Sequence, residues 1–169
     1  MDTDNSSAEH AIDKYLSAME SFLHLFIQDS PFELSFSVRK ADAQTDDPEA
    51  PDYVVDFSGP DADLLLEKNA TLLHAIEYVV LKAIRLDEDH FRKIAFDCQD
   101  WRRTRMEELR LMALVAAERV ADTGNPLTLN PMNPRERRII HMALRDQSQV
   151  RTQSEGVGPE RKVVIYPAK

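Results

Sequence analysis

The chain contains little cysteine and little glycine: one cysteine, Cys98, and four glycines in 169 residues. A single cysteine cannot form an internal disulfide or a cysteine-based zinc site, which is typical of a reducing, cytoplasmic protein. Four glycines and nine prolines exclude collagen-like and glycine-rich low-complexity chains. No run of about 18 uncharged apolar residues is present, and residues 1–9 are acidic rather than basic. We therefore expect neither direct membrane insertion nor a secretory signal.

Motifs of common catalytic and cofactor-binding sites are also missing. The sequence has no HExxH or paired Cys/His spacing, no Walker loop, no GxSxG elbow and no dinucleotide fingerprint. We therefore predict no catalytic residue, no metal site and no cofactor. The rival interpretation is a small phosphate-ester enzyme that uses His141. No base, metal or nucleophile accompanies that histidine in the sequence, and Ser154 is expected to lie at a distance from it.

Charged residues make up 30% of the chain, and the two signs are divided unevenly along it. Residues 1–100 contain 8 Lys+Arg and 22 Asp+Glu, whereas residues 101–169 contain 13 Lys+Arg and 8 Asp+Glu. This divide predicts two modules with different partners, of which the basic module is the candidate binder of a polyanion. The alternative is that the net charge only sets solubility.

Apolar periodicity predicts the order helix, strand, strand, helix, helix, strand in the first module. Apolar residues at helical spacing run from Ile12 to Ile27. Alternating patterns predict strands at 32–38, 53–57 and 93–98, and residues 61–88 are predicted to be helical in two pieces. Residues 41–52 contain five acidic residues and no apolar period, which predicts a loop.

The second module is predicted to begin with a long helix after Trp101 that ends at Gly124, where a glycine favours the left-handed residue of a helix end. A short extended piece follows at 127–129. Asn133 as N-cap, with proline at the first helical position and glutamate at the third, predicts a helix up to about residue 146. Strands at 149–152 and 161–166 are predicted around a turn at 154–159. The fold class of the whole chain is therefore α+β.

The helix after Asn133 carries the candidate binding residues. Arg137 and His141 are four residues apart, so their side chains lie on the same side of the helix. Arg138 and Arg145 flank His141 and extend a basic stripe, which suits a phosphate backbone. The alternative is a solvated helix face whose histidine only packs.

The start of the preceding helix carries three further arginines. Arg102, Arg103 and Arg105 lie at the positive end of the helix dipole, where they indicate an external anion. Contacts with Asp100, Glu107 or Glu108 explain them equally well.

The motifs on and after the helix that begins at Asn133 resemble one bacterial family. The run PMNPRERRIIH at 131–141, SEGVGP at 154–159 and VVI at 163–165 closely resemble the C-terminal half of the Jag (SpoIIIJ-associated, KhpB) family. That half is an Arg-xxx-His, or R-three-H, domain, which is associated with single-stranded nucleic acid. The resemblance implies such a domain at 101–169, with the family's arginine and histidine at Arg137 and His141.

The resemblance also implies a type II KH domain at 8–100, whose element order is the one that periodicity predicts. A KH domain clamps nucleotides with a GXXG loop, which the alignment places at Glu67, Lys68, Asn69 and Ala70. No glycine occurs between Gly59 and Gly124. Glu67 repels phosphate, and Lys68 alone suits it. We therefore expect a degenerate KH-like domain that serves as a scaffold or a protein contact surface, with no separate N-terminal Jag domain before it.

The sequence therefore predicts non-catalytic binding of single-stranded RNA or DNA through the R-three-H domain. Arg137 and His141 are the central residues, with His141 expected near its ordinary pKa of about 6.5. The predicted supporting residues are those that fix the helix or add positive charge: Asn133, Arg138, Arg145, Arg151, Arg161, Arg102 and Arg103. The alternative is an adaptor that pairs with another KH-domain protein or a second copy of itself. The resemblance also implies a membrane-insertase machinery as a partner.

Overall fold

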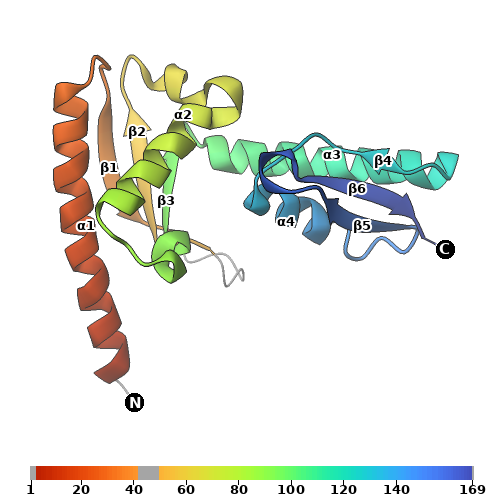
Figure 1. The fold of residues 1–169 in the computed structure, drawn as a ribbon, viewed down its shortest axis with the longest axis horizontal. Helices are drawn as coiled ribbons and strands as arrows, with labels where there is room; N and C mark the ends of the chain where they lie inside the picture. Colours follow the sequence, from red (N-terminus) through yellow and green to blue (C-terminus); the bar gives the residue numbers. More distant parts are fainter. Residues whose placement is uncertain (1–2, 42–49, 169) are drawn as a thin grey trace. The chain divides into compact units, whose positions relative to one another are not determined.

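The computed structural model describes residues 3–41 and 50–168, with the backbone alone for residues 3–13, 88, 89 and 92. The chain divides into two compact units, Met1–Trp101 and Arg102–Lys169 (Figure 1). The predicted α+β class is confirmed: each unit combines helices with a small three-stranded sheet. Most of the predicted loop at 41–52 lies outside the described residues.

The first unit follows the predicted order of elements. Its helices and strands are α1 (Thr3–Asp29), β1 (Ser35–Lys40), β2 (Tyr53–Ser58), α2 (Ala62–Ala83), the 3₁₀ helix η1 (Glu88–Lys93) and β3 (Ile94–Cys98). Strand β2 is central, antiparallel to β1 and parallel to β3. The unit is therefore a mixed sheet whose edges are β1 and β3.

Helices α1 and α2 cover one face of this sheet (Figure 1). Side chains alternate between the two faces of a strand, and Val55, Phe57 and Phe96 point to the helical side. There they pack with residues of both helices, among them Met19 and Leu73, in one buried core. Burial of this apolar surface is the main driving force for the unit.

Helix α2 is interrupted where the KH loop was predicted. Glu67 is extended, and the next three residues, Lys68, Asn69 and Ala70, have φ angles of 50°, 63° and 56°. These angles are left-handed, a conformation that glycine adopts without strain and other residues adopt at a cost of about 1–2 kcal/mol each. The predicted division of 61–88 into two helical pieces is therefore confirmed.

The second unit contains all of α3 (Trp101–Thr123) but its first residue, followed by β4 (Leu127–Thr128), α4 (Pro134–Ala143), β5 (Val150–Glu155), the 3₁₀ helix η2 (Gly158–Glu160) and β6 (Lys162–Pro167). The antiparallel sheet has the order β4-β6-β5, so β5 is an edge strand. Its core joins Leu109 and Val120 of α3, Ile140 of α4, and Val163 and Ile165 of β6.

Two predicted boundaries in this unit were wrong. Helix α4 ends at Ala143 instead of running to about residue 146. Strand β5 continues to Glu155, so Ser154, predicted in a turn, is paired opposite Val163. The reason is tertiary: β6 offers a pairing partner along all of β5, and a strand ends where its partner ends. The predicted helix end at Gly124 is confirmed, since its φ is +66° and its N–H donates to the carbonyl of Val120 at 2.9 Å.

The end of α2 yields a prediction about stability. Arg85 has a φ of 55°, its N–H donates to the carbonyl of Lys82 at 3.0 Å, and the N–H of Leu86 donates to that of Leu81 at 3.2 Å. This is a Schellman ending, which favours glycine at the left-handed position. We expect Arg85→Gly to raise the free energy of unfolding of this unit by about 1 kcal/mol, measured by urea unfolding with the fluorescence of Trp101.

The matched control is Arg85→Ala, which removes the exposed guanidinium but keeps the Cβ atom and its strain. Its midpoint is expected to stay close to that of the parent protein. Equal stability of the glycine and alanine variants would contradict the backbone argument.

Candidate nucleic-acid interface

Helix α4 begins with the cap that the sequence predicts. The side-chain oxygen of Asn133 accepts a hydrogen bond from the N–H of Glu136 at 2.9 Å, and the carboxylate of Glu136 accepts one from the N–H of Asn133 at 3.1 Å. Pro134 occupies the first helical position, where no N–H is needed. The cap fixes where the helix starts and therefore which side chains share each of its faces.

Glu136 also connects α4 to α3. Its side chain is buried, and its second oxygen accepts a hydrogen bond from Nε of Arg105 at 2.8 Å. Arg105 also donates to the exposed Glu108 at 3.2 Å. Burial lowers the pKa of Arg105, but hydrogen bonds and charge from Glu136 and Glu108 outweigh it and raise the pKa overall. The expected contact between Arg105 and Glu108 is thus confirmed, whereas the sequence did not reveal the contact with Glu136.

Arg137 and His141 lie one turn apart on α4, and both are half-buried. The Nε atom of Arg137 is shielded from solvent and has no hydrogen-bond acceptor among the residues that the structure describes. Burial lowers the pKa of His141, and the charge of Arg137 lowers it further. The expectation of an ordinary pKa for His141 was therefore wrong: its pKa is lowered, which favours the neutral imidazole.

Both ring nitrogens of His141 contact hydroxyl groups of β5. Nδ1 lies 2.7 Å from Oγ1 of Thr152, and Nε2 lies 2.8 Å from Oγ of Ser154. The expectation that Ser154 lies far from His141 was wrong. Strand β5 extends further than predicted and brings residues 152 and 154 to the face next to α4. Hydroxyl groups donate as well as accept, so they match either tautomer of the ring and hold its orientation.

The remaining predicted cations of α4 and its surroundings occupy different places. Arg138 is half-buried and engaged in other interactions, whereas Arg145 is exposed beyond the end of the helix, 3.5 Å from Asp146. The carbonyl of Arg161 accepts a hydrogen bond from the N–H of Met132 at 3.2 Å, which places this exposed arginine near the start of α4.

Arg151 lies on the other face of the sheet. Because Thr152 and Ser154 face α4, alternation along β5 directs Arg151 to the opposite side, where its guanidinium covers the ring of Tyr166. Arg102 and Arg103 lie in the first turn of α3, and each interacts with other groups of the protein. The structure therefore brings Arg137 and His141 together, adds Thr152 and Ser154, and separates Arg151 from them.

The loop at 67–70 offers little to a phosphate. Glu67, Lys68 and Asn69 are exposed, so one carboxylate and one ammonium group stand on the same short loop. Ala70 is buried, and the hydroxyl of Thr71 donates to the carbonyl of Lys68 at 2.6 Å. The Cβ atoms and the carboxylate both hinder the close approach of a phosphate to backbone amides.

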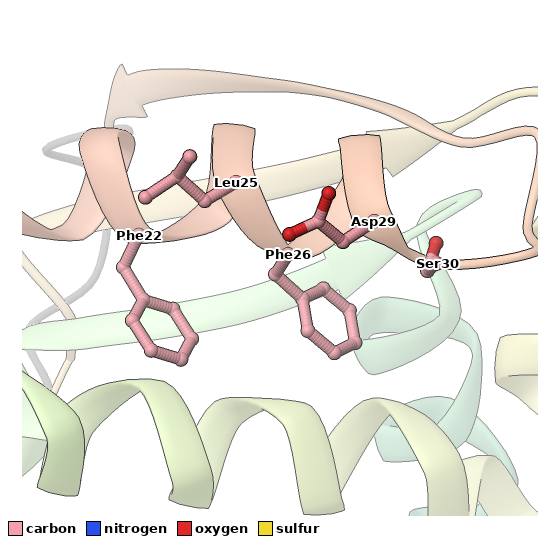
Figure 2. Close-up of a pocket in the computed structure, with 5 residues that line it drawn as sticks. All are labelled: Phe22, Leu25, Phe26, Asp29 and Ser30. Carbon is pink, nitrogen blue, oxygen red and sulfur yellow. The ribbon is translucent and has the colours of Figure 1, made fainter.

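A pocket of about 310 Å³ lies in the first unit and is lined by Phe22, Leu25, Phe26, Asp29 and Ser30 (Figure 2). In Figure 2 the rings of Phe22 and Phe26 project from the side of α1 that faces α2. Among the described residues that line it, Asp29 alone carries a charge. None of the predicted binding residues lines it, and its chemistry does not suit a polyanion.

Within the described residues, no group of three or more histidine, cysteine, aspartate or glutamate side chains is arranged to hold a metal ion. In the same part of the chain, no helix has the length and apolar character needed to cross a bilayer.

Residues 107–167 match the R-three-H domain family. These residues, from within α3 to β6, therefore resemble an R-three-H domain, the class of domain that the Arg-xxx-His spacing on α4 predicts.

Over about two thirds of its length the chain is also similar to proteins named RNA-binding protein KhpB. It is 34% identical over 111 residues to that of Clostridium symbiosum, with 66% of this chain and 50% of the relative covered. The identity is 32% for that of Bacillus subtilis, covering 64% and 53%, and 29% for that of Lactiplantibacillus plantarum, covering 66% and 34%. The predicted resemblance to the Jag family is thus confirmed, although the match spans only about half, or less, of each relative.

The contact between Glu136 and Arg105 yields a prediction. In Glu136→Gln the amide still caps α4, but the half-buried guanidinium of Arg105 loses its buried charged partner and keeps only the exposed Glu108. We expect the free energy of unfolding of this unit to fall by about 2 kcal/mol, less than for a fully buried pair. Urea unfolding followed by circular dichroism measures the change.

The matched control is Glu108→Gln, which removes the other carboxylate of the same arginine. The side chain of Glu108 is 60% exposed against 6% for Glu136, so this variant is expected to lose no more than about 0.5 kcal/mol. Equal losses in the two variants would show that burial does not set the strength of the Glu136 contact.

Proposed function

We propose that this protein binds single-stranded RNA without catalysing a reaction, and that it does so through the face of the R-three-H domain formed by Arg137 and His141. Both side chains project from α4. The cap at Asn133 and the contact of Glu136 with α3 hold this helix in place. The relatives named as RNA-binding proteins support RNA as the ligand. The arginines near either end of α4, Arg145 and Arg161, add positive potential around the site.

The observation that carries the proposal is the unpartnered Nε of Arg137. A shielded N–H without an acceptor costs about 1–3 kcal/mol, and a charged guanidinium recovers this cost when it binds a phosphate oxygen. The partly exposed side chain of Arg137 leaves room for such a ligand. A phosphate binds at this exposed part of the guanidinium; because Nε is shielded, a hydrogen bond to Nε itself requires a shift of the side chain.

The role of His141 follows from its neighbours. Thr152 and Ser154 hold the ring beside Arg137, so the imidazole keeps one orientation before RNA arrives. Preorganisation of this kind reduces the entropy that binding costs.

The contact between Ser154 and His141 raises the alternative of a serine nucleophile. A histidine that activates a serine is oriented by a carboxylate at its other nitrogen. Here the other nitrogen contacts the hydroxyl of Thr152, which stabilises an imidazolium far less than a carboxylate does. The contact therefore supports a positioning role for Ser154 rather than catalysis.

For the first unit we propose a KH-like scaffold that does not clamp RNA with its loop. The three left-handed residues without glycine and the exposed carboxylate of Glu67 support this role. A protein partner at this unit, such as another KH-domain protein or a second copy of the chain, is the alternative primary function. It predicts no RNA affinity in the experiment that follows.

The first test of the proposal is Arg137→Ala, measured by fluorescence anisotropy with a labelled single-stranded RNA at low salt. We expect the affinity to fall about tenfold or more, because a charge-assisted hydrogen bond is lost. The slope of log affinity against log salt should become shallower by about 0.7, since one phosphate contact fewer releases fewer counterions.

The control for this test is Lys68→Ala, which removes the cation of the KH-like loop. We expect its affinity to match that of the parent protein. A large loss with Lys68→Ala and none with Arg137→Ala would move the site to the first unit, and no binding by the parent protein would favour the adaptor. Cleavage of the RNA would favour the enzyme.

A second test is the pH dependence of binding. A phosphate offsets the charge of Arg137 and stabilises the imidazolium, so binding raises the pKa of His141 from its lowered value in the free protein. The complex then holds more protons than the free protein, and affinity should rise as pH falls from about 7.5 to about 5.5, by at most about tenfold per unit. His141→Gln should show a much flatter profile.

The lowered pKa of His141 also affects stability: a lower pH strengthens RNA binding but weakens the fold. The folded state disfavours the protonated imidazole, so the fold loses stability as pH falls through about 6.5. Circular dichroism at each pH establishes that the protein is folded during the titration. An equally steep profile for the glutamine variant would exclude His141 as the titrating group.

A further inference from the structure

The outer face of the R-three-H sheet carries a cation–π pair of side chains, Arg151 and Tyr166. The guanidinium carbon of Arg151 lies 4.4 Å from the centre of the Tyr166 ring, and the two residues are direct cross-strand partners on β5 and β6. The hydroxyl of Tyr166 donates to the carboxylate of Glu155, and this hydrogen bond raises the pKa of the phenol. The ring is therefore held at its edge by Glu155 and covered on its face by Arg151.

The geometry of β5 relates this pair to the RNA site on the other face. The side chains of Thr152 and Ser154 point toward His141. Arg151 directly precedes Thr152 in the sequence, so its side chain points to the opposite face of the sheet. Strand β5 is an edge strand, since the sheet order is β4-β6-β5. A chain that passes around this edge reaches both faces without crossing another strand.

We propose that a single-stranded RNA passes around the edge of β5 and stacks one base on the guanidinium of Arg151, while a neighbouring phosphate is bound by Arg137 on the α4 side. This inference rests on the proposed function of that side. It adds a base-binding subsite, formed by Arg151 and Tyr166, whose ligand is the flat face of a nucleobase.

The chemistry of the pair favours a base over a phosphate. A guanidinium is planar and stacks on aromatic rings, and the ring of Tyr166 beneath it restricts its position. Arg151 is exposed, so the face turned away from Tyr166 is open to a ligand. The carboxylate of Glu155 beside the ring repels a phosphate but not a neutral base. Every base has such a face, so we expect little sequence preference at this subsite.

The test compares two RNA strands of about twelve nucleotides, one of uniform adenosine and one in which every base is replaced by an abasic sugar. Both strands carry the same phosphates, so their affinity ratio reports contacts with bases. We expect the full-length parent protein to bind the abasic strand about tenfold more weakly. In Arg151→Ala and Arg151→Lys this ratio should fall to about twofold, because lysine keeps the charge but has no planar group to stack.

Two controls separate stacking from charge. Arg161→Ala removes another exposed arginine of the domain and should weaken both strands equally, leaving the ratio intact. Tyr166→Phe keeps the ring and should also keep the ratio, whereas Tyr166→Leu should lower it.

The outcomes distinguish this inference from the proposed function. If Arg137→Ala weakens both strands but Arg151→Lys keeps the parent ratio, Arg151 acts by charge alone and the subsite is overturned while the function stands. If Arg137→Ala changes the affinity for neither strand, the proposed function itself fails.

Discussion

The arrangement of the R-three-H domain depends on one buried carboxylate. Glu136 accepts a hydrogen bond from the N-cap residue of its own helix with one oxygen and from Arg105 of α3 with the other. The first contact sets the start of α4, and the second holds the helix against its neighbour. Because helical residues three or four apart share a face, fixing the start of α4 also decides which face receives Arg137 and His141.

The candidate binding face combines His141, whose two ring nitrogens have hydrogen-bond partners, with Arg137, whose Nε has none in the described chain. His141 is held through both nitrogens by β5, whereas Nε of Arg137 has no acceptor within the described chain. Such a combination suits the recognition of an anion, because the imidazole is oriented before binding and the guanidinium still lacks an acceptor at Nε. The first unit has the opposite character, with an acidic composition and a loop whose left-handed residues all carry side chains.

Much of the fold could be predicted from local patterns. The order of elements in both units, the cap at Asn133 and the end of α3 at Gly124 depend on residues that are close in sequence. The length of β5 could not be predicted in this way, because Ser154 belongs to the strand only through its pairing with Val163. For the same reason the hydrogen-bond partners of His141 could not be predicted. With the true length of β5 known, alternation along the strand places Thr152 and Ser154 on the same face.

The sequence by itself predicted an R-three-H domain in the second unit, which the family match supports, and it predicted the central pair of the candidate site. The spacing of Arg137 and His141 on a capped helix requires only local geometry, and the R-three-H match is consistent with it. Only the tertiary structure decided which charges belong to that site: it paired Arg105 with Glu136 and turned Arg151 to the other face of the sheet. The physical reason is that a side chain's charge is known from its residue type, but its partners are set by packing between distant segments.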